Sequence, residues 1–462
     1  MFRFILFCIF HLSTVLAFAQ PDYTISINNN PHPGNLFFQV GGPPSKPVCI
    51  IDSTGTLIYN EDFGLKGWAW QVNMNNKISF FDRQTKGWCI MDSLENIVDT
   101  VYCQNNYIAD NHDFLALENG HYVLFAYDEQ LYASDTIVAN GSSNQNIIGL
   151  LIQELDENKN VLFEWSSFDH YFLSEYPSIY DNLGNSSLDF LHCNAIEIDE
   201  DGHFLISNRN ISEITKINRT TGDVIWRFGG DQSDFEMTND YPFSKQHCIK
   251  SLGNSRYLLY DNGNNSNIYT GGIKRSRAVE YELDLNNYTA TKVWSFVHPD
   301  SLFTPSIGSV QRLDNGNTLI CFGNNQLNER GAVITEVNAN NEIVFEMEFD
   351  FGQNVYCANK AKWDFYDETV QINENLNTAV LNNCVYPNPS ASYFYIKNVT
   401  NDEAIKKIVV YNLNGEVLLT KETDTFELNN DLKINHTLLP GAYLIIVISD
   451  NNYRINRLYV VD

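Results

Sequence analysis

A hairpin pattern of hydrophobic residues recurs between residues 48 and 345 of the chain. Each copy has an apolar run that ends at an Asp or Asn, a short turn, and a second apolar run. Hairpins repeated in this way, with turn residues at similar offsets, are typical of radial β-repeats. The six copies span residues 48–59, 88–98, 151–165, 214–228, 279–296 and 333–345.

A second hairpin precedes each of these copies. Two hairpins per repeat supply four strands, so the pattern predicts an all-β fold, a six-bladed β-propeller over residues 20–375. Two β-sandwiches in tandem are the alternative, but they do not explain the strict alternation of the two hairpins. The preceding hairpins are expected at residues 23–40, 70–81, 112–125, 192–207, 247–260 and 308–322.

A separate module is expected after an Asn-rich linker at residues 376–384. Short apolar runs fill residues 385–462, and the Asn414-Gly415 pair between two of them favours a tight hairpin turn. This pattern predicts a small Ig-like β-sandwich.

The N-terminus has the pattern of a secretory signal peptide. One positive charge at Arg3 precedes an apolar run over residues 4–18, and Ala17-Phe18-Ala19 fits a small-x-small cleavage site. A membrane anchor is the alternative, but the run is short for a span. We therefore expect a signal peptide over residues 1–19, export, and no transmembrane span after cleavage.

Charge excludes some classes of partner. The chain has 29 Lys and Arg against 57 Asp and Glu, a net charge of −28. A nucleic-acid binder needs a basic face, so no nucleic-acid partner is expected. The sequence contains no P-loop and no GxGxxG motif, so no nucleotide is expected either.

Histidine recurs at one position of the predicted repeat. His112 and His247 each lie five residues before the Leu of the inner turn, Gly308 takes that position in the last repeat, and His192 takes it in a slightly longer run. The first strand of a propeller blade lines the central channel, so the three His side chains are expected to meet at one mouth. Cys193 and Cys248, which each follow one of these His residues, are expected to point away from the channel into the blade packing.

The residues around these His indicate an oxyanion site. Alternation puts Asn194 on the same side as His192, and Arg209 ends the second strand of that hairpin. A three-His metal site is possible, but a fixed cation repels a metal, so none is expected. Arg forks onto two oxygens of a sulfate or phosphate. A neutral imidazole can donate, accept or attack, and Gln246-His247 suggests the nucleophile.

Residues 20 to about 368 resemble the bacterial arylsulfate sulfotransferases, six-bladed propellers that move a sulfuryl group between phenols. The resemblance implies an aryl sulfate donor, a phenol acceptor and no cofactor. It rests on five motifs that stand in the family's order, namely Asn111-His112-Asp113, Leu191-His192-Cys193-Asn194-Ala195, Ile206-Ser207-x-Arg209, residues 222–230 around Trp226, and Gln246-His247.

The resemblance also implies a role for each matching residue. His247 matches the nucleophile that is transiently sulfurylated in a ping-pong reaction. Ser309 is the nearest candidate for a further hydroxyl contact in the last blade. The groups that hold the sulfuryl and phenolic oxygens match His112, His192, Asn194 and Arg209. Aromatic residues that would stack on the phenol, with core packing as the alternative, are Trp68, Phe190 and Tyr241.

The C-terminal module resembles the sorting domain of the type IX secretion system of Bacteroidetes. The resemblance implies a secretion-machinery partner, transit through the periplasm, and a secreted or cell-surface protein. The alternative is a carbohydrate-binding or adhesive sandwich. The matching residues are Tyr386-Pro387-Asn388-Pro389, Tyr411-Asn412-x-x-Gly415-Glu416, Leu438-x-x-Gly441-x-Tyr443 and Arg457-Leu458-x-Val460.

Two other functions stay open on the sequence. A related propeller with water as the acceptor would be an aryl-sulfate hydrolase on the same site. A propeller without catalysis would bind a surface glycan or a protein and use the C-terminal module only for export.

Overall fold

Antiparallel strands make up most of the regular structure in the computed structural model of the chain. The structure describes residues 22–42, 46–93, 95–139, 141–183, 187–325, 329–363, 385–386, 391–396, 405–412, 417–422, 432–449 and 453–460. The chain divides into two units, Met1–Asp367 and Glu368–Asp462. The predicted signal peptide, the 376–384 linker and the Asn414-Gly415 turn lie outside the described residues.

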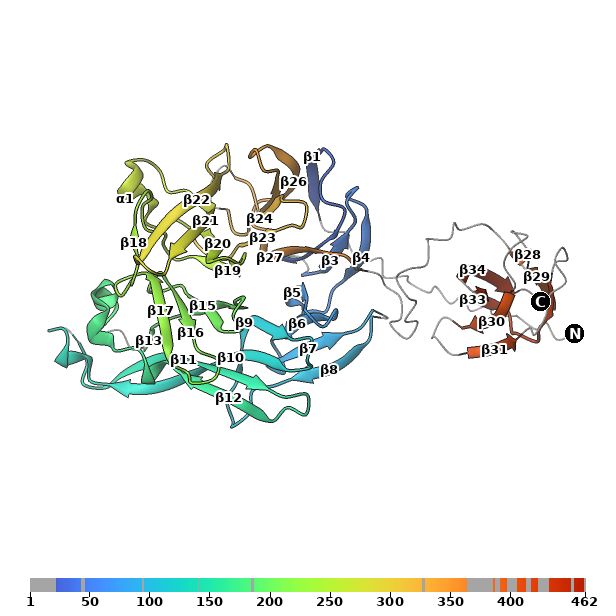
Figure 1. Cartoon of the computed structure of the whole chain (residues 1–462), viewed down its shortest axis with the longest axis horizontal. Coiled ribbons are helices and arrows are strands. Elements are labelled where there is room, and N and C mark those ends of the chain that lie inside the picture. The colour runs from blue at the N-terminus through green and yellow to red at the C-terminus, as the bar shows by residue number, and fades with distance from the viewer. Residues whose placement is uncertain are drawn as a thin grey trace, which may run out of the picture. The chain divides into compact units, whose positions relative to one another are not determined.

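Six sheets surround a central channel in the described part of the first unit (Figure 1). The predicted six-bladed β-propeller is therefore confirmed. From inner to outer strand, the first blade consists of β27(Asn354–Ala361), β2(Asn35–Gly41), β3(Val48–Ile51) and β4(Leu57–Glu61), and the second of β5(Trp68–Val72), β6(Ile78–Asp82), β7(Gly87–Met91) and β8(Ile97–Val101). The third consists of β9(Ala109–Ala116), β10(Tyr122–Tyr132), β11(Gln145–Leu155) and β12(Val161–Ser166), and the fourth of β14(Cys193–Ile198), β15(Phe204–Asn208), β16(Glu213–Ile217) and β17(Val224–Gly229). The fifth consists of β19(His247–Ser251), β20(Arg256–Asp261), β21(Arg277–Asp284) and β22(Thr289–Val297), and the last of β23(Ser309–Arg312), β24(Thr318–Phe322), β25(Val333–Val337), β26(Ile343–Phe349) and β1(Tyr23–Asn28).

Short strands and short helical segments accompany the main strands of the blades. Two short strands pair in parallel with blade strands, β13(Ser187–Asp189) with β11 and β18(Glu236–Met237) with β22. The helical segments among the described residues are η1(Ser134–Thr136), η2(Ser167–Asp169), η3(Leu173–Glu175), η4(Pro177–Asn182) and α1(Ser266–Thr270).

The first blade differs from the prediction. Residues 23–40 were expected to form its inner hairpin, but β1 pairs with β26 of the last blade, and Tyr23 lies opposite Phe349. The inner strand of the first blade is instead β27, which pairs with β2 and puts Phe37 opposite Asn359. In this way the first strand of the propeller belongs to the last blade and the last strand to the first blade, which ties the two blades together.

Acidic and amide side chains at the predicted turns explain why the hairpins form there. The Asp156 carboxylate accepts hydrogen bonds from the backbone N–H groups of Asn158 and Asn160, at 2.9 and 2.8 Å. Asp52 does the same for Thr54 and Thr56, at 2.8 and 3.0 Å. Such bonds hold the chain in a tight turn between two apolar strands.

The core lies between neighbouring sheets. Because each blade is packed on both faces, whole strands are buried: every residue of β3, β6, β7 and β25 is buried. Between the fourth and fifth blades, for example, Leu205 and Phe228 pack with Leu259 and Tyr281. Such faces read as continuous apolar runs rather than as alternation. Successive inner strands contact one another around the channel, which positions their side chains for a shared site.

The second unit is a small β-sandwich, as predicted. Phe394, Ile396 and Ile434 of one sheet share a core with Ile408 and Ile445 of the other. In their pairing order, the strands of the two sheets are β28(Val385–Tyr386), β29(Tyr393–Ile396) and β32(Leu432–Asn435), and β31(Val417–Glu422), β30(Ile405–Tyr411), β33(Gly441–Ser449) and β34(Tyr453–Val460).

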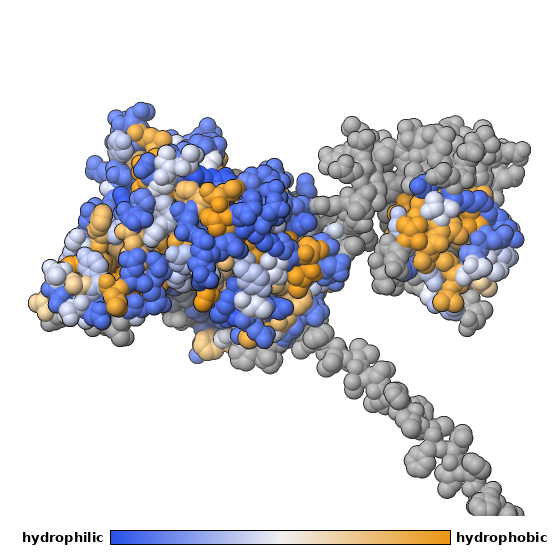
Figure 2. All heavy atoms as spheres, turned by 90° about the horizontal axis from the view of Figure 1, so that it is seen from below, coloured by the Kyte–Doolittle hydropathy of each residue, from blue (hydrophilic) through white to orange (hydrophobic). Residues whose placement is uncertain are grey.

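The surface in Figure 2 is largely hydrophilic on the propeller, with separate apolar patches. Among the described residues, the helices are all too short or too polar to cross a membrane.

Candidate active site

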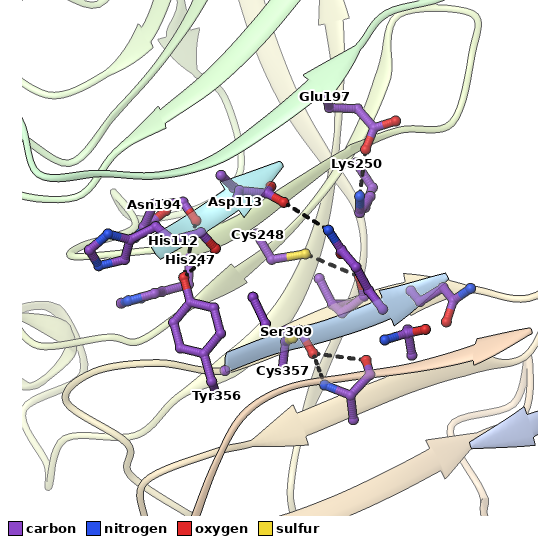
Figure 3. A pocket seen from close by; sticks show the side chains of 18 of the residues that line it. His112, Asp113, Asn194, Glu197, His247, Cys248, Lys250, Ser309, Tyr356 and Cys357 are labelled. Carbon is purple, nitrogen blue, oxygen red and sulfur yellow. Dashed lines mark hydrogen bonds and ion pairs between the residues drawn. The ribbon is translucent and has the colours of Figure 1, made fainter. Parts of the chain in front are cut away.

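The six inner strands enclose a channel cavity of about 410 Å³. Figure 3 shows its polar side chains in two groups. His112, Asn194, His247 and Tyr356 lie on one side of the cavity, and the Lys250–Glu197 ion pair lies on the other, with 2.6 Å between Lys250 Nζ and Glu197 Oε2. Of the residues predicted to carry the chemistry, His112, Asn194, His247 and Ser309 line this cavity, whereas His192 and Arg209 are not among its lining residues.

The three predicted His residues share one arrangement. In each, Nδ1 lies within hydrogen-bond distance of a side-chain oxygen: Asp110 Oδ1 at 2.7 Å for His112 and Asp189 Oδ2 at 2.5 Å for His192. His247 has Asn262 Oδ1 at 2.7 Å. An oxygen at Nδ1 leaves Nε2 of each ring for other chemistry. The partners differ in charge, because two are carboxylates and one is a neutral amide.

The amide of Asn262 fixes the tautomer of His247. Its Nδ2 donates hydrogen bonds to the backbone oxygens of Thr304 and Ile307, at 2.8 and 2.9 Å. Its Oδ1 therefore faces His247, and an amide oxygen can only accept. His247 thus carries its proton on Nδ1 and its lone pair on Nε2, where the N–H of Ile307 donates a long bond of 3.2 Å.

His247 is held neutral. Its side chain is buried, and this burial is the main reason that its pKa lies well below the usual range. The Asn262 bond opposes the shift, while the nearby Arg209, His112 and His192 add to it. A neutral, desolvated imidazole with a free lone pair is the form of His that acts as a nucleophile.

The pKa of His112 is shifted in the opposite direction to that of His247. Burial alone would lower its pKa, but the charge and hydrogen bond of Asp110 outweigh that effect, so the pKa is raised. Its ring lies edge-on to that of His192, with 4.8 Å between the ring centroids. A His whose protonated form is favoured can give a proton to a leaving oxygen.

Arg209 lies beside the His cluster, directly after the second strand of its blade. Its guanidinium donates to Asn210 Oδ1 and to the backbone oxygen of Pro305, at 3.1 and 3.0 Å. Among the described residues, no carboxylate lies within ion-pair distance of it. Its backbone N–H bonds to His192 O at 3.2 Å. A guanidinium that lacks a carboxylate partner and lies near enough to His247 to lower its pKa is suited to binding an anion.

Asn194 also faces the cavity. It is buried, and its Nδ2 donates to the backbone oxygen of Gln246 at 2.8 Å. Its Oδ1 finds no donor among the described residues. A buried acceptor without a partner is costly, and a ligand hydroxyl would satisfy it.

The other predicted residues have different surroundings. Ser309 lies on the channel wall, where its hydroxyl donates to Ala358 O and accepts from Ala358 N, at 3.0 and 2.9 Å. Phe190 is part of the core. The expectation for Cys248 is wrong, because Cys248 lines the channel cavity. Its φ of +54° departs from the regular strand alternation on which that expectation rested.

The sequence analysis missed four side chains that shape the site: Asp110, Asp189, Asn262 and Tyr356. A signal existed for Asn262, since it follows β20 directly, as Arg209 follows β15 one blade earlier. Asp110 and Asp189 lie two and three residues before the His that they contact. Tyr356 gave none, because its bond to the His112 carbonyl, at 2.9 Å, spans 244 residues.

Among the residues that the structure describes, there is no group of three or more His, Cys, Asp or Glu side chains that could hold a metal ion.

Two family models match the chain. The model described as Arylsulfotransferase (ASST) matches residues 28–357. The model described as Secretion system C-terminal sorting domain matches residues 384–461. The second match assigns the protein to secretion or export to the cell surface. No curated protein matches the chain.

Solved structures with similarity to the chain are distant. A protein of unknown function from Bacteroides caccae has 12% identity and a TM-score of 0.42 over 71% of this chain and 98% of its own. A streptogramin B lyase has 9% identity and a TM-score of 0.37 over 70% and 86%. An inactive virginiamycin B lyase from Staphylococcus aureus, solved with quinupristin, has 9% identity and a TM-score of 0.37 over 71% and 89%.

Proposed function

The chain belongs to the arylsulfotransferase family, and from this premise we propose that it transfers a sulfuryl group from an aryl sulfate to a phenol in two steps through His247. The observation that carries the proposal is the contrast among the three His residues. His247 is paired with an amide and held neutral, whereas His112 and His192 are paired with carboxylates. The ring of His247 is therefore suited to attack, and the ring of His112, whose pKa is raised, is suited to give a proton.

In the first step, the Nε2 lone pair of His247 attacks the sulfur of the aryl sulfate. The N–S bond forms as the S–O bond to the aryl group breaks, and the departing phenolate takes the proton from Nε2 of protonated His112. The products are a free phenol and an enzyme with one SO₃ group on His247. A phenol has a pKa near 10, so protonation of the leaving oxygen helps poor leaving groups most.

In the second step, the acceptor phenol gives its proton to His112 and its oxygen attacks the same sulfur. The S–O bond forms, the N–S bond breaks, and His247 regains its lone pair. Before the attack, the unpaired Oδ1 of Asn194 would accept a hydrogen bond from the acceptor hydroxyl, whose one proton would then pass to His112. The donor has no proton on its bridging oxygen, so this contact would favour the acceptor.

Positioning and charge stabilisation supply most of the rate in this proposal. Sulfuryl transfer, like phosphoryl transfer, passes through a loose in-line transition state with charge on the equatorial oxygens. Arg209 would bind two of these oxygens with its fork, and His192 would contribute a further donor. The N–H of Ile307, which bonds to Nε2 at rest, would be released for a sulfuryl oxygen when Nε2 attacks.

The proposed function is tested by incubating the protein with a chromogenic aryl sulfate, with and without an added phenol. The proposal predicts release of the chromophore that depends on the phenol, together with sulfation of that phenol. Release at the same rate without an acceptor, and free sulfate as product, would favour the hydrolase. No release from several donors would favour a binding propeller.

The Asp110→Asn variant is expected to lose activity at alkaline pH. In the wild type, Asp110 raises the pKa of His112, so the acid form persists above the usual His range and is lost as pH rises through that pKa. Removing the carboxylate lowers the pKa, and the alkaline limb of kcat/KM should move down by about one pH unit or more. The measurement is a pH profile with a donor whose leaving phenol is a weak acid.

A donor with a strongly acidic leaving phenol is the internal control for Asp110→Asn. Its phenolate leaves without a proton, so its profile should hardly move. An alkaline limb that stays in place for both donors would show that His112 is not the acid.

The Asn262→Asp variant is expected to create a loss of activity at acidic to neutral pH. A carboxylate at Nδ1 would stabilise the imidazolium and raise the pKa of His247 by about one to three units, and protonated His247 has no lone pair to attack with. Activity should return as pH rises. The measurement is kcat/KM against pH, with the wild type flat over the same range because the pKa of His247 is low. An Asn262→Asp profile as flat as that of the wild type would count against a role for Asn262 in keeping His247 neutral.

For the C-terminal unit, we propose recognition by the type IX secretion machinery. The match of residues 384–461 to a sorting domain supports this partner.

A further inference from the structure

A second cavity, of about 230 Å³, lies between the first and second blades. We call it the side cavity and define it by Lys46, Lys66, Trp68, Arg83 and Asn354, which are among its lining residues. Trp68 and Asn354 begin the inner strands β5 and β27, which lie side by side in Figure 1. His247 likewise begins the inner strand β19, so all three lie at the end of the channel where the inner strands begin.

A row of aromatic rings links the side cavity to the sulfuryl site. The Trp68 ring packs on Tyr356, with 4.5 Å between centroids. Tyr356 in turn lies 6.1 Å from the His112 ring and donates a hydrogen bond to the His112 carbonyl at 2.9 Å. The two cavities are therefore neighbours with an aromatic wall between them. A substrate with its sulfuryl group at His247 and a second group in the side cavity would have to extend along these rings.

The side cavity is positively charged in a chain whose net charge is −28. Three cations line it, and among the described residues only Lys66 has an ion-pair partner, Asp82 at 3.4 Å. The guanidinium of Arg83 lies 4.0 Å from the Trp68 ring and pairs with no carboxylate in the described part of the chain. Arg83 is half-buried, so its charge loses hydration without gaining a counter-ion.

An anionic ligand would supply that counter-ion. We propose that the side cavity selects aryl substrates that carry a second acidic group, a carboxylate or a sulfate, on the side of the ring away from the reacting oxygen. Arg83 binds that group with its fork, and Lys46 and Lys66 add attraction. This inference rests on the proposed function and names its substrate class. A strongly negative protein repels such substrates at long range, and a local cluster of cations offsets that repulsion at the mouth.

The test compares two acceptors that differ only in charge, 4-hydroxyphenylacetate and its neutral amide, with 4-methylumbelliferyl sulfate as the donor. The full-length protein is expected to prefer the acid. In Arg83→Gln, kcat/KM for the acid should fall about tenfold, the size expected for one hydrogen bond to a charged group, through a higher KM. The value for the amide should stay unchanged. Arg83→Lys should keep part of the preference, because it keeps the charge but not the fork.

Arg256→Gln is the matched control, since Arg256 pairs with Glu280 and does not line the side cavity. It should leave both acceptors unaffected. Equal use of acid and amide by the wild type would overturn the inference. So would an equal loss for both acceptors in Arg83→Gln, because that result assigns Arg83 a structural role.

A protein that does not transfer sulfuryl groups would be recognised by a result different from those that test the side cavity. If the wild type releases no phenol from any donor, transfer is wrong, and the side cavity is then tested by binding alone. Titration of 4-hydroxyphenylacetate against tryptophan fluorescence should show binding that weakens about tenfold in Arg83→Gln. Equal binding by wild type and variant would overturn the side cavity as an anion subsite.

Discussion

Replacing His247 by Asn is expected to reduce sulfuryl transfer by at least about 10⁴-fold, because loss of the nucleophile leaves only positioning and charge stabilisation. Asn is close in size and polarity but has no lone pair on nitrogen at the position of Nε2. The site around it should persist, since Asn262 is held by its own bonds to Thr304 and Ile307. The measurement is the initial rate of phenol-dependent chromophore release.

His121→Asn is the matched control for this loss. Nδ1 of His121 lies 2.8 Å from Glu154 Oε1, and His121 is not among the residues that line the channel cavity. It should keep full activity. An active His247→Asn enzyme would contradict transfer in two steps through His247 and would favour direct transfer from donor to acceptor.

Replacing Arg209 by Gln is expected to lower kcat about 10²- to 10³-fold, the cost usually found when one preorganised donor to a developing charge is removed. Arg209 has no carboxylate partner among the described residues, so the change breaks no internal ion pair. It also removes a cation that lowers the pKa of His247. That second effect raises the pKa of the nucleophile, so the loss should grow as pH falls.

Arg209→Lys separates charge from geometry. Lys keeps the positive charge but cannot fork onto two oxygens, so we expect an intermediate rate with the pH dependence of the wild type. Arg219→Gln, at an ion pair with Glu154 away from the cavity, controls for the loss of an arginine. Full activity in Arg209→Gln would remove Arg209 from the chemistry.

Most of the blades could be predicted from the sequence because the strands of each hairpin and the turn between them lie close together in the chain. Each hairpin pairs strands a few residues apart, and turn residues such as Asp52 and Asp156 mark where the chain reverses. The first blade could not be predicted in this way. Its inner strand, β27, comes from the end of the propeller, and β1 pairs with β26 across more than 300 residues. Local pattern carries no signal for such closure.

The part of the candidate site that could be predicted from the sequence is the part that recurs at one position of the repeat. Three His at one repeat offset predicted that their side chains meet. The ring centroids of His112 and His192 lie 4.8 Å apart, and His112 and His247 line the channel cavity. Their chemical difference was not predictable, because it depends on whether Asp110, Asp189 or Asn262 lies at Nδ1. Asp110 lies at the start of β9, Asp189 ends the short strand β13, and Asn262 directly follows β20. Only the fold brings them together.

The difference between amide and carboxylate partners explains how similar rings could act differently. A carboxylate favours imidazolium, so His112 can serve as an acid. The bond to the Asn262 amide oxygen also raises the pKa of His247, but it brings no negative charge, so burial and the nearby Arg209 outweigh it and His247 stays neutral. Pairs of titratable groups whose environments push their pKa values apart are the usual sign of divided acid and nucleophile roles.

The measurement that tests the central claim most directly is mass analysis of the enzyme after a brief reaction with an aryl sulfate in the absence of acceptor. Transfer through His247 predicts a single added SO₃ group on the peptide that contains His247, and its loss when phenol is added. Phenol-dependent turnover with no SO₃ on that peptide, or with SO₃ on another residue, would contradict the claim.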